Sequence, residues 1–175
     1  MKTIWLGIFA LILAISTQAQ DLPINSETKL ISYNNVVEVS GTADELYNKA
    51  HRWFFSYYKN PTNVVKESAN QKIVAKPRFK ILNPADKNGV QTMAGIVLYS
   101  FTVEFKEGRF RYEITNVEWQ QNSKYPIERW MDKTSPSYNE KYNYYLEQVD
   151  KEMKLVVDAL TKAMLQAEKT QKSDW

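Results

Sequence analysis

A long β-hairpin in the middle of the chain constrains the fold more than any other segment. Residues 93–105 and 110–119 alternate apolar and polar side chains, and Glu107–Gly108 between them suits a two-residue hairpin loop. With Lys106 opposite Arg109, one face is apolar throughout, and its pairs are Phe105 with Phe110, Val103 with Tyr112 and Phe101 with Ile114. The other face pairs Glu104 with Arg111 and Thr102 with Glu113. A slip of one residue would invert both faces, so the pattern predicts this register.

Further strands are expected on the N-terminal side of the hairpin. Residues 30–39 alternate, which places on one side of a strand the residues Ile31, Tyr33, Val37 and Val39. Further along, a period of two predicts strands at 63–68 and 72–81, separated by a turn at Asn70–Gln71. Pro77 lies inside the second of these strands, and a proline there indicates an edge position or a bulge.

Two helices are predicted, each beginning at a capping box. Thr42 and Glu45 can exchange hydrogen bonds, and the helix that follows has apolar residues at helical spacing, namely Leu46, Ala50, Trp53, Phe54 and Tyr57. Ser137 and Glu140 have the same spacing. They precede a long helix with one continuous apolar stripe, formed by Tyr142, Leu146, Val149, Met153, Val156, Leu160 and Met164.

The predicted order is strand, helix, four strands, helix. An antiparallel sheet of about five strands with both helices on one face would bury one side of the strands and both helical stripes. The predicted fold class is therefore α+β. Residues 30–167 form a single domain, after a flexible lead-in at 20–29 and before a frayed tail at 168–175.

Parts of this pattern resemble a known protein family. The opening of that family is similar to one passage of this chain, which continues to Trp53 and begins with Val37-Glu38-Val39-Ser40-Gly41-Thr42-Ala43-Asp44-Glu45-Leu46-Tyr47. The hairpin segment that is also similar is Arg109-Phe110-Arg111-Tyr112-Glu113-Ile114. The family consists of exported bacterial domains of unknown function with a TBP-like fold, like one repeat of the TATA-binding protein. The resemblance spans about residues 30–165 and implies this fold, without any known activity or catalytic residues.

The N-terminus has the pattern of a secretory signal peptide. Lys2 precedes the apolar run Ile4–Ile15, and small residues predict cleavage after Ala19, which leaves Gln20 as the new N-terminus. The run is shorter than the roughly 20 residues that span a bilayer, although a retained anchor helix is the alternative. Removing residues 1–19 from 175 leaves 156 residues and, because Lys2 is lost, lowers the formal charge from +3 to +2.

Composition narrows the classes of protein further. The chain has no cysteine, which excludes disulfides, a thiol nucleophile and an acylated N-terminal cysteine. A net charge this close to zero gives no electrostatic case for nucleic acid as a partner. We expect a soluble periplasmic or secreted protein with no transmembrane segment in the mature chain.

Continuing the hairpin register toward the end of its second strand places four apolar residues on the outer, otherwise polar face of the sheet. Val117 would lie opposite Leu98, and Trp119 opposite Ile96. Either a bulge near Thr115–Asn116 turns Val117 and Trp119 back to the core, or this end of the outer face is apolar. In the second case the four residues are a candidate partner or ligand site.

An apolar outer face would need a cover. Residues 120–137 are one candidate, because they include Tyr125 and Trp130. A ligand or a partner protein is the other candidate.

A basic run precedes the hairpin and consists of Lys66, Lys72, Lys76, Arg78 and Lys80. Lys76, Arg78 and Lys80 alternate with apolar residues, so they share the outer face of the sheet. They form a candidate anion patch for an acidic polysaccharide, a lipid head group or an acidic partner. The alternative is protection of an edge strand, because lysines and a proline discourage strand-to-strand aggregation.

The sequence predicts no catalytic residue, no metal site and no cofactor. His51 is the single histidine, and metal sites need several ligands. We expect His51 to be a residue on the flank of the first helix that packs beside the second helix. A general acid needs burial or a like-charge neighbour to raise its pKa. Glu104 and Glu113 instead have basic or polar cross-strand partners in the predicted register, so neither is a candidate. Aromatic residues near the second helix could form a sugar platform or the rim of the core: Tyr138, Tyr142, Tyr144 and Tyr145.

Three functions follow as hypotheses. The first is an exported, non-catalytic binding module of the cell envelope, with an envelope protein or an apolar or anionic ligand as partner. The second is a small carrier of an apolar ligand between the sheet and the long helix. The third is a carboxylate-dependent hydrolase, which would need a buried pair of carboxyl groups facing a cleft.

Overall fold

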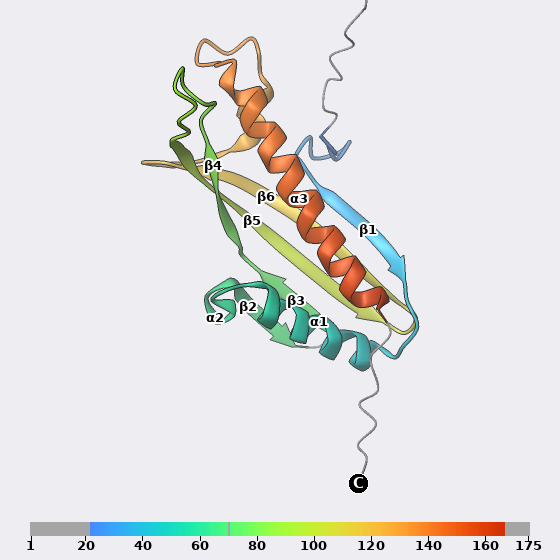
Figure 1. Cartoon of the computed structure of the whole chain (residues 1–175). Coiled ribbons are helices and arrows are strands. Elements are labelled where there is room, and N and C mark those ends of the chain that lie inside the picture. The colour runs from blue at the N-terminus through green and yellow to red at the C-terminus, as the bar shows by residue number, and fades with distance from the viewer. Residues whose placement is uncertain (1–21, 70, 167–175) are drawn as a thin grey trace, which may run out of the picture.

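The predicted hairpin forms the centre of the sheet (Figure 1). The structure is a computed structural model that describes residues 22–69 and 71–166. β5 (Met93–Lys106) and β6 (Arg109–Gln120) pair in the predicted register from the turn as far as Ser100 and Thr115, which confirms that part of the prediction. The predicted signal peptide, its predicted cleavage site between Ala19 and Gln20, and the predicted tail at 168–175 lie outside the described residues.

Five shorter strands flank this hairpin. They are β1 (Tyr33–Glu38), β2 (Val65–Ala69), β3 (Lys72–Ala75), β4 (Arg78–Leu82) and β7 (Lys124–Pro126). All pairings are antiparallel, and the order is β1-β6-β5-β3-β2, with β4 beside β5 and β7 beside β6. The α+β class with an antiparallel sheet is confirmed, although the described sheet has seven strands rather than about five.

The strand predicted at 72–81 is divided at Pro77. β3 pairs with residues 101–104 of β5, and β4 pairs with residues 93–98 of the same strand. Proline has no N–H group to donate, and the preceding Lys76 N–H donates to the Val64 carbonyl at 2.8 Å. The chain therefore leaves the β2–β3 side of the sheet at this point and continues along β5 as β4.

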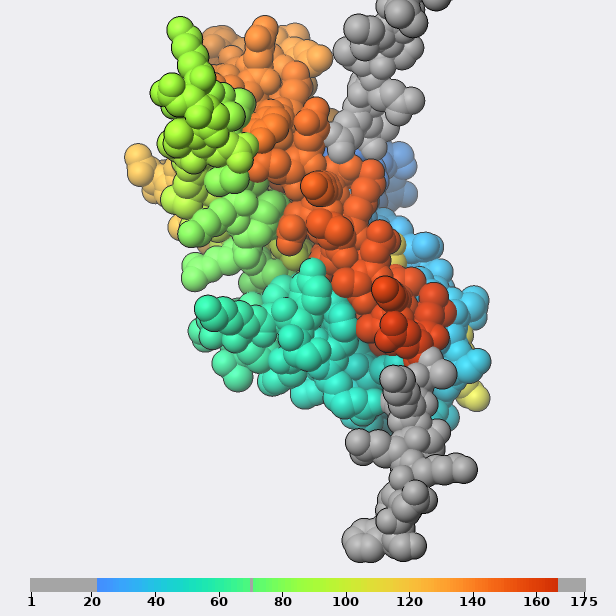
Figure 2. Space-filling model, in the orientation of Figure 1, coloured from blue at the N-terminus to red at the C-terminus, as the bar shows by residue number. Residues whose placement is uncertain are grey.

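Two helices cover one face of the sheet, as predicted. They are α1 (Ala43–Tyr57) and α3 (Lys141–Leu165), and both lie on the face that Figure 2 shows, α1 in teal and α3 in red-orange. Two short helical turns were not predicted: α2 (Pro61–Val64) and the 3-10 turn η1 (Ile127–Met131). Among the described helices, none is both long enough and apolar enough to cross a membrane.

One of the two predicted capping boxes is present. At α1, the Thr42 hydroxyl accepts the Glu45 N–H at 3.3 Å, and the Glu45 carboxylate accepts the Thr42 N–H at 2.8 Å. At α3 the prediction from Ser137 and Glu140 was wrong, because the helix begins at Lys141 and the Asn139 side chain accepts the Lys141 N–H at 2.9 Å. Asparagine makes this local bond without the box.

The core lies between the sheet and the two helices. The predicted stripe of α3 is buried from Leu146 onward, and Tyr142 is partly buried. The largest side chains that are fully enclosed come from all parts of the fold: Ile31, Leu46, Phe54, Ile73, Ile81, Phe101, Phe110, Ile114, Ile127, Met153, Leu160 and Met164. Side chains therefore fill the space in which the carrier hypothesis would place a ligand.

The segment before β1 has a defined conformation where a flexible lead-in was expected. Ile24 and Ile31 form an isolated β-bridge, and Asn25 accepts the Lys29 N–H and donates its own N–H to the Leu30 carbonyl, both at 2.9 Å. Leu22 is buried. Residues 22–31 therefore pack against the rest of the domain.

Candidate functional site

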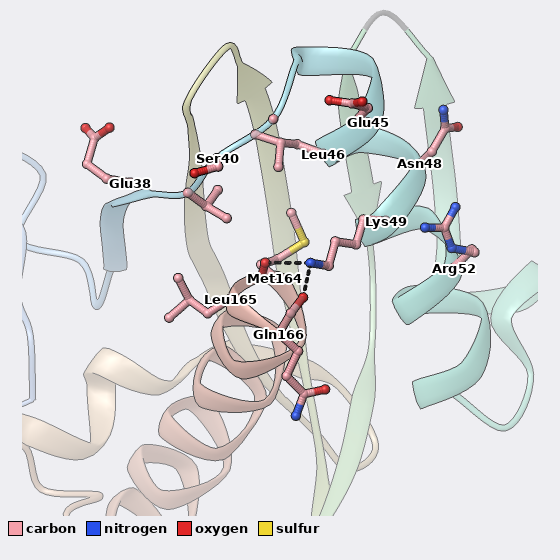
Figure 3. Close-up of a pocket in the computed structure, with 12 residues that line it drawn as sticks. Glu38, Ser40, Glu45, Leu46, Asn48, Lys49, Arg52, Met164, Leu165 and Gln166 are labelled. Carbon is pink, nitrogen blue, oxygen red and sulfur yellow. Dashed lines mark hydrogen bonds between the residues drawn. The ribbon is translucent and has the colours of Figure 1, made fainter. Parts of the chain in front are cut away.

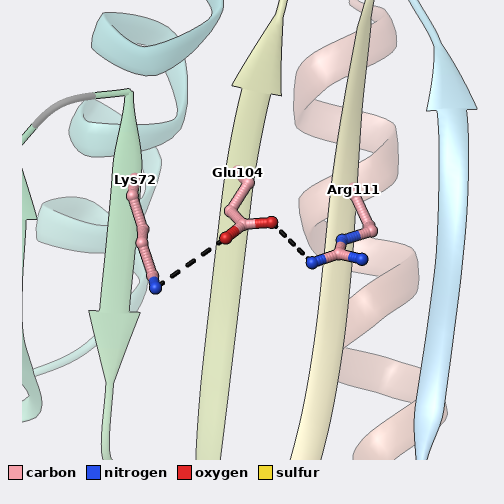
Figure 4. A network of polar contacts seen from close by, with 3 residues as sticks. All are labelled: Lys72, Glu104 and Arg111. Carbon is pink, nitrogen blue, oxygen red and sulfur yellow. Dashed lines mark hydrogen bonds and ion pairs between the residues drawn. The ribbon is translucent and has the colours of Figure 1, made fainter.

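In the close-up of Figure 4 the helices lie behind the strands, so the sheet face toward the viewer is the one that α1 and α3 do not cover; the short turns α2 and η1 contact α1 and α3, respectively. Near the hairpin turn, the Glu104 carboxylate accepts a hydrogen bond from Arg111 at 2.7 Å and lies 3.7 Å from the Lys72 ammonium group. The predicted pairing of Glu104 with Arg111 is therefore confirmed. Because Glu104 forms an ion pair with a cation on each neighbouring strand, these three residues are an ordinary cross-strand ladder.

The far end of the same face brings two predicted groups of site residues together. In the pairing of β4 with β5, Arg78 lies opposite Leu98 and Lys80 lies opposite Ile96. Arg78 and Lys80 are exposed, while Leu98 and Ile96 are partly buried. Neither cation has an ion pair or a side-chain hydrogen bond with any residue that the structure describes. We call these four residues the β4–β5 strip.

Lys76 is the third member of the predicted anion patch. It is exposed and lies two residues before Arg78, on the other side of the break at Pro77. β4 pairs with β5 alone among the described strands, so it is an edge strand. The three basic residues therefore also provide the edge protection that was the alternative interpretation.

The predicted apolar patch does not exist as a group of four residues on the outer face. Leu98 lies opposite Glu118, and Ile96 lies opposite Gln120, because the register shifts between Leu98 and Ser100. Val117 is 1 % exposed and belongs to the core. Ile96 and Leu98 remain on the outer face, while Val117 and Trp119 turn to the helix side.

A bulge at Thr115–Asn116 is the reason for this correction. Ser100 pairs with Thr115 and Leu98 with Glu118, so that one residue of β5 faces two residues of β6. Asn116 has a φ of 53°, a left-handed conformation that asparagine tolerates better than most residues. The extra residue turns the following side chains through one step of the pleat. The first of the two sequence interpretations is thus confirmed.

Trp119 becomes part of an aromatic cluster on the helix side. Its ring lies 5.4 Å from that of Trp130, which also contacts Tyr142 and Tyr145, each at 5.6 Å between ring centres. Trp130 therefore covers Trp119 in the core and not on the outer face. Tyr144 points elsewhere and accepts a hydrogen bond from Gln91 at 2.9 Å, so the tyrosines do not form one sugar platform.

A groove of about 670 Å³ lies between α1, the loop before it and the end of α3 (Figure 3). Lys49 reaches across it and donates hydrogen bonds to the carbonyl groups of Met164, at 2.9 Å, and Gln166. These carbonyls end α3, so the lysine caps that helix and ties it to α1. The groove combines three segments that are distant in sequence, and no local pattern indicated it.

Glu45, one of two glutamates that line the groove, is also bonded within the protein. Hydrogen bonds from Thr42 lower the pKa of the Glu45 carboxyl group. This carboxylate is part of the α1 capping box. We therefore assign the groove a structural role, the attachment of α1 to α3.

The buried titratable groups form no catalytic pair. Asp150 is 2 % exposed and is the single buried acidic residue of the described chain. It accepts a hydrogen bond from the Tyr33 hydroxyl at 2.9 Å and lies 2.6 Å from the Lys154 ammonium group. The hydrolase hypothesis needs two buried carboxyl groups, and the described residues do not provide them.

A second group of polar side chains in or near the core consists of the phenols of Tyr58, directly after α1, and Tyr99 of β5. Burial raises the pKa of both Tyr58 and Tyr99, and the neighbouring Tyr58 raises the pKa of Tyr99 further. Burial also raises the pKa of Glu152 on α3. No nucleophile or cleft accompanies these groups in the described part of the fold, so we assign them to the core.

His51 is a helix-flank residue. Its ring stacks on that of Phe55 at 4.3 Å and lies 6.1 Å from that of Tyr47. Tyr47, on the same flank, is within hydrogen-bond distance of Ser68 in β2. This flank of α1 therefore faces β2, whereas we expected it to pack beside the second long helix. The described residues contain no cluster of three potential metal ligands.

Two solved structures resemble this fold. A crystal structure of a TBP-like protein from Parabacteroides distasonis has a TM-score of 0.58 and 15% sequence identity, over 79% of this chain and 96% of that chain. A DUF4468 family protein from Bacteroides ovatus has a TM-score of 0.56 and 16% identity, over 79% of this chain and 90% of that chain. At such identities the likeness shows the fold alone.

The family assignment rests on a match of the sequence itself. No curated protein matches the chain. The model of a family described as a domain of unknown function (DUF4468) with TBP-like fold matches residues 33–120, which contain α1 and the whole β5–β6 hairpin. This agrees with the resemblance found at the start of α1 and at the hairpin turn. The chain therefore belongs to the DUF4468 family of domains with a TBP-like fold.

Proposed function

We propose that this protein is an exported, non-catalytic binding module of the cell envelope that binds its partner through the β4–β5 strip. One observation carries the proposal: two cations without ion pairs, Arg78 and Lys80, lie directly beside Leu98 and Ile96 on the helix-free face. Nearer the hairpin turn, two other cations of this face, Lys72 and Arg111, each form an ion pair with Glu104.

The chemistry of the strip supports an anionic partner with apolar groups. Unpaired cations on a sheet surface attract anions, and adjacent apolar area adds affinity when water is displaced. The signal pattern at Lys2 to Ala19 supports export. A formal charge of +3 for the whole chain favours a local patch over general attraction to nucleic acid.

The two other hypotheses receive less support. An apolar carrier needs an internal space, whereas Phe101, Ile114 and Met153 are fully buried between the sheet and the helices. A hydrolase needs a pair of acidic groups, whereas Asp150 is bonded to Tyr33 and Lys154. We therefore retain the binding module as the proposal.

Charge reversal at the strip tests the proposal. The tagged mature protein would be incubated with a solubilised envelope extract of its own host, and the retained material would be quantified. We expect the double variant Arg78→Glu/Lys80→Glu to lose the bound partner. The matched control is Lys106→Glu/Arg109→Glu, which makes the same change of charge at the hairpin end of the same face.

The comparison of the two variants decides the result. Circular dichroism and thermal unfolding would first establish that both variants fold like the parent protein. Equal retention of the partner by both double variants would contradict the strip as the binding surface. Loss of the partner in the control variant alone would move the site to the other end of the sheet.

A further inference from the structure

The outer edge of β4 has unused backbone hydrogen-bonding groups. The Tyr99 N–H of β5 donates to the Pro77 carbonyl at 3.3 Å, so the backbone groups of Pro77 face β5. In an antiparallel pair these groups alternate between the two edges of a strand. The N–H and C=O groups of Arg78 and Lys80 therefore face away from β5, where β4 has no neighbouring strand among the described residues.

Both ends of this edge are already closed by the protein. At one end, the Gln148 side chain accepts the Leu82 N–H and donates to the Leu82 carbonyl, each at 2.9 Å. At the other end, the Lys76 N–H donates to the Val64 carbonyl. Arg78 and Lys80 remain between the two closures. The edge is thus a short slot whose backbone groups match those of one extended segment.

The side chains around the slot determine which segment fits. Lys76, Arg78 and Lys80 are exposed on the outer face, and no residue that the structure describes neutralises Arg78 or Lys80. A second copy of the chain would bring the same positive charges to this edge, and like charges on paired strands repel. Carboxylate groups at alternate positions of an extended segment would instead meet all three cations.

We propose that an extended acidic polypeptide segment binds as an additional strand along β4. Its backbone exchanges hydrogen bonds with Arg78 and Lys80, and its carboxylates contact the three basic side chains. Alternate apolar side chains of the segment lie toward Phe79, which is partly buried on the helix side of β4. This inference rests on the proposed function, because it names the partner of the same strip.

A synthetic peptide of alternating glutamate and valine, blocked at both ends, is the probe. Binding to the full mature protein would be followed by NMR and by hydrogen exchange. We expect chemical shift changes and slower exchange at the amides of Arg78 and Lys80. A peptide of the same sequence with N-methylated backbone amides, and one with lysine in place of glutamate, should both bind at least about tenfold more weakly.

One substitution separates backbone pairing from charge. Lys80→Pro removes the edge-facing N–H and the charge, while Lys80→Ala removes the charge alone. The β4–β5 hydrogen bonds survive both changes, because the Lys80 backbone faces away from β5. We expect Lys80→Pro to bind the peptide about tenfold more weakly than Lys80→Ala. If Lys80→Pro fails to fold, the comparison of the methylated and unmodified peptides makes the same test.

The outcomes also distinguish this inference from the proposed function. Equal binding of the peptide to Lys80→Pro and Lys80→Ala, with equal binding of the methylated peptide, would overturn strand addition. If vesicles of phosphatidylglycerol bind the protein and Arg78→Glu/Lys80→Glu abolishes that binding, while the peptide does not bind, the strip functions but its partner is a lipid surface. If the double variant binds peptide and vesicles like the parent protein, the strip itself is not the site.

Discussion

The indole ring of Trp119 lies directly against the backbone of Gly95. A Cβ atom added at Gly95 would be 2.2 Å from the Trp119 Nε1 atom, and the φ of Gly95 is 153°. The glycine therefore serves a close approach of ring and backbone, which is one of the few reasons for glycine inside a strand. This contact allows Trp119 to enter the core after the bulge.

Substitution of Gly95 should be more destabilising than substitution of an exposed glycine. We expect Gly95→Ala to lower the free energy of unfolding by about 3 kcal/mol, because the ring must move and the backbone is strained. Gly89 has a positive φ of 80° with nothing within 4 Å, so Gly89→Ala should cost about 1 kcal/mol from strain alone. Urea denaturation measures both, and equal losses would show that the ring contact is unimportant.

The bulge predicts a specific preference at Asn116, where φ is 53°. Asn116→Gly should change stability by less than about 0.5 kcal/mol, because glycine adopts this conformation freely. Asn116→Val should cost about 2 kcal/mol, because a β-branched residue is strained there. Thr115→Val is the control at an ordinary backbone position. Urea unfolding of the three variants would contradict the bulge if Asn116→Val were as stable as the control.

The bond between Tyr33 and Asp150 predicts a loss of stability in alkali. Burial and the neighbouring Asp150 raise the pKa of Tyr33 above its ordinary value of 10.0. Above about pH 10 the unfolded chain therefore releases a proton that the folded chain retains, and stability falls as the pH rises. Tyr33→Phe should lower stability near neutral pH by about 1 kcal/mol and should make the alkaline decline shallower.

Urea midpoints between about pH 8 and pH 11 test this dependence on pH. Tyr125 is 39 % exposed, so Tyr125→Phe is the matched control for removing a phenol. An alkaline decline of the same steepness in Tyr33→Phe and in the control would show that the Tyr33 phenol does not contribute to it.

The side chain of Gln148 predicts local stability at β4. Gln148→Ala removes two hydrogen bonds to Leu82, and we expect it to lower the free energy of unfolding by about 2 kcal/mol and to speed exchange of the Leu82 amide. Gln148→Glu keeps an acceptor for the Leu82 N–H but loses the donor, so its effect should be intermediate. Glu147→Ala changes the exposed neighbour on α3 and is the control. Unchanged exchange at Leu82 would contradict the role of Gln148.

The signal pattern predicts both export and the N-terminus that cleavage would leave. In the native host, the intact mass should correspond to a chain that begins at Gln20. Ala19→Asp should prevent this cleavage, because the position before the cut requires a small residue. A protein recovered at the mass of the full chain would instead support a retained anchor.

Several features of the fold follow from the sequence by itself. The register near the hairpin turn was predictable because Phe105 with Phe110 and Glu104 with Arg111 sort both faces at once. The start of α1 was predictable because Thr42 and Glu45 satisfy the first amides of the helix locally. In each case the determining interactions lie within one element or between adjacent strands, so the local pattern contains the information.

Other features depended on contacts between distant segments. The sequence located a conflict near Asn116, but the burial of Trp119 against Trp130 and Gly95 decided in favour of the bulge. Likewise, the alternation placed Arg78 and Lys80 on the outer face, while the pairing of β4 with β5 decided that they lie beside Leu98 and Ile96.

The physical reason is the distance along the chain between the residues whose interactions stabilise each feature. A polar and an apolar face, a helix cap and a signal peptide are each properties of a short segment. A bulge or a divided strand becomes favourable through burial and pairing with residues far along the chain, and the same pairing decides which residues of two strands lie side by side. The sequence alone thus determined the class of fold and the outward position of the three cations, and the tertiary structure decided which residues surround them.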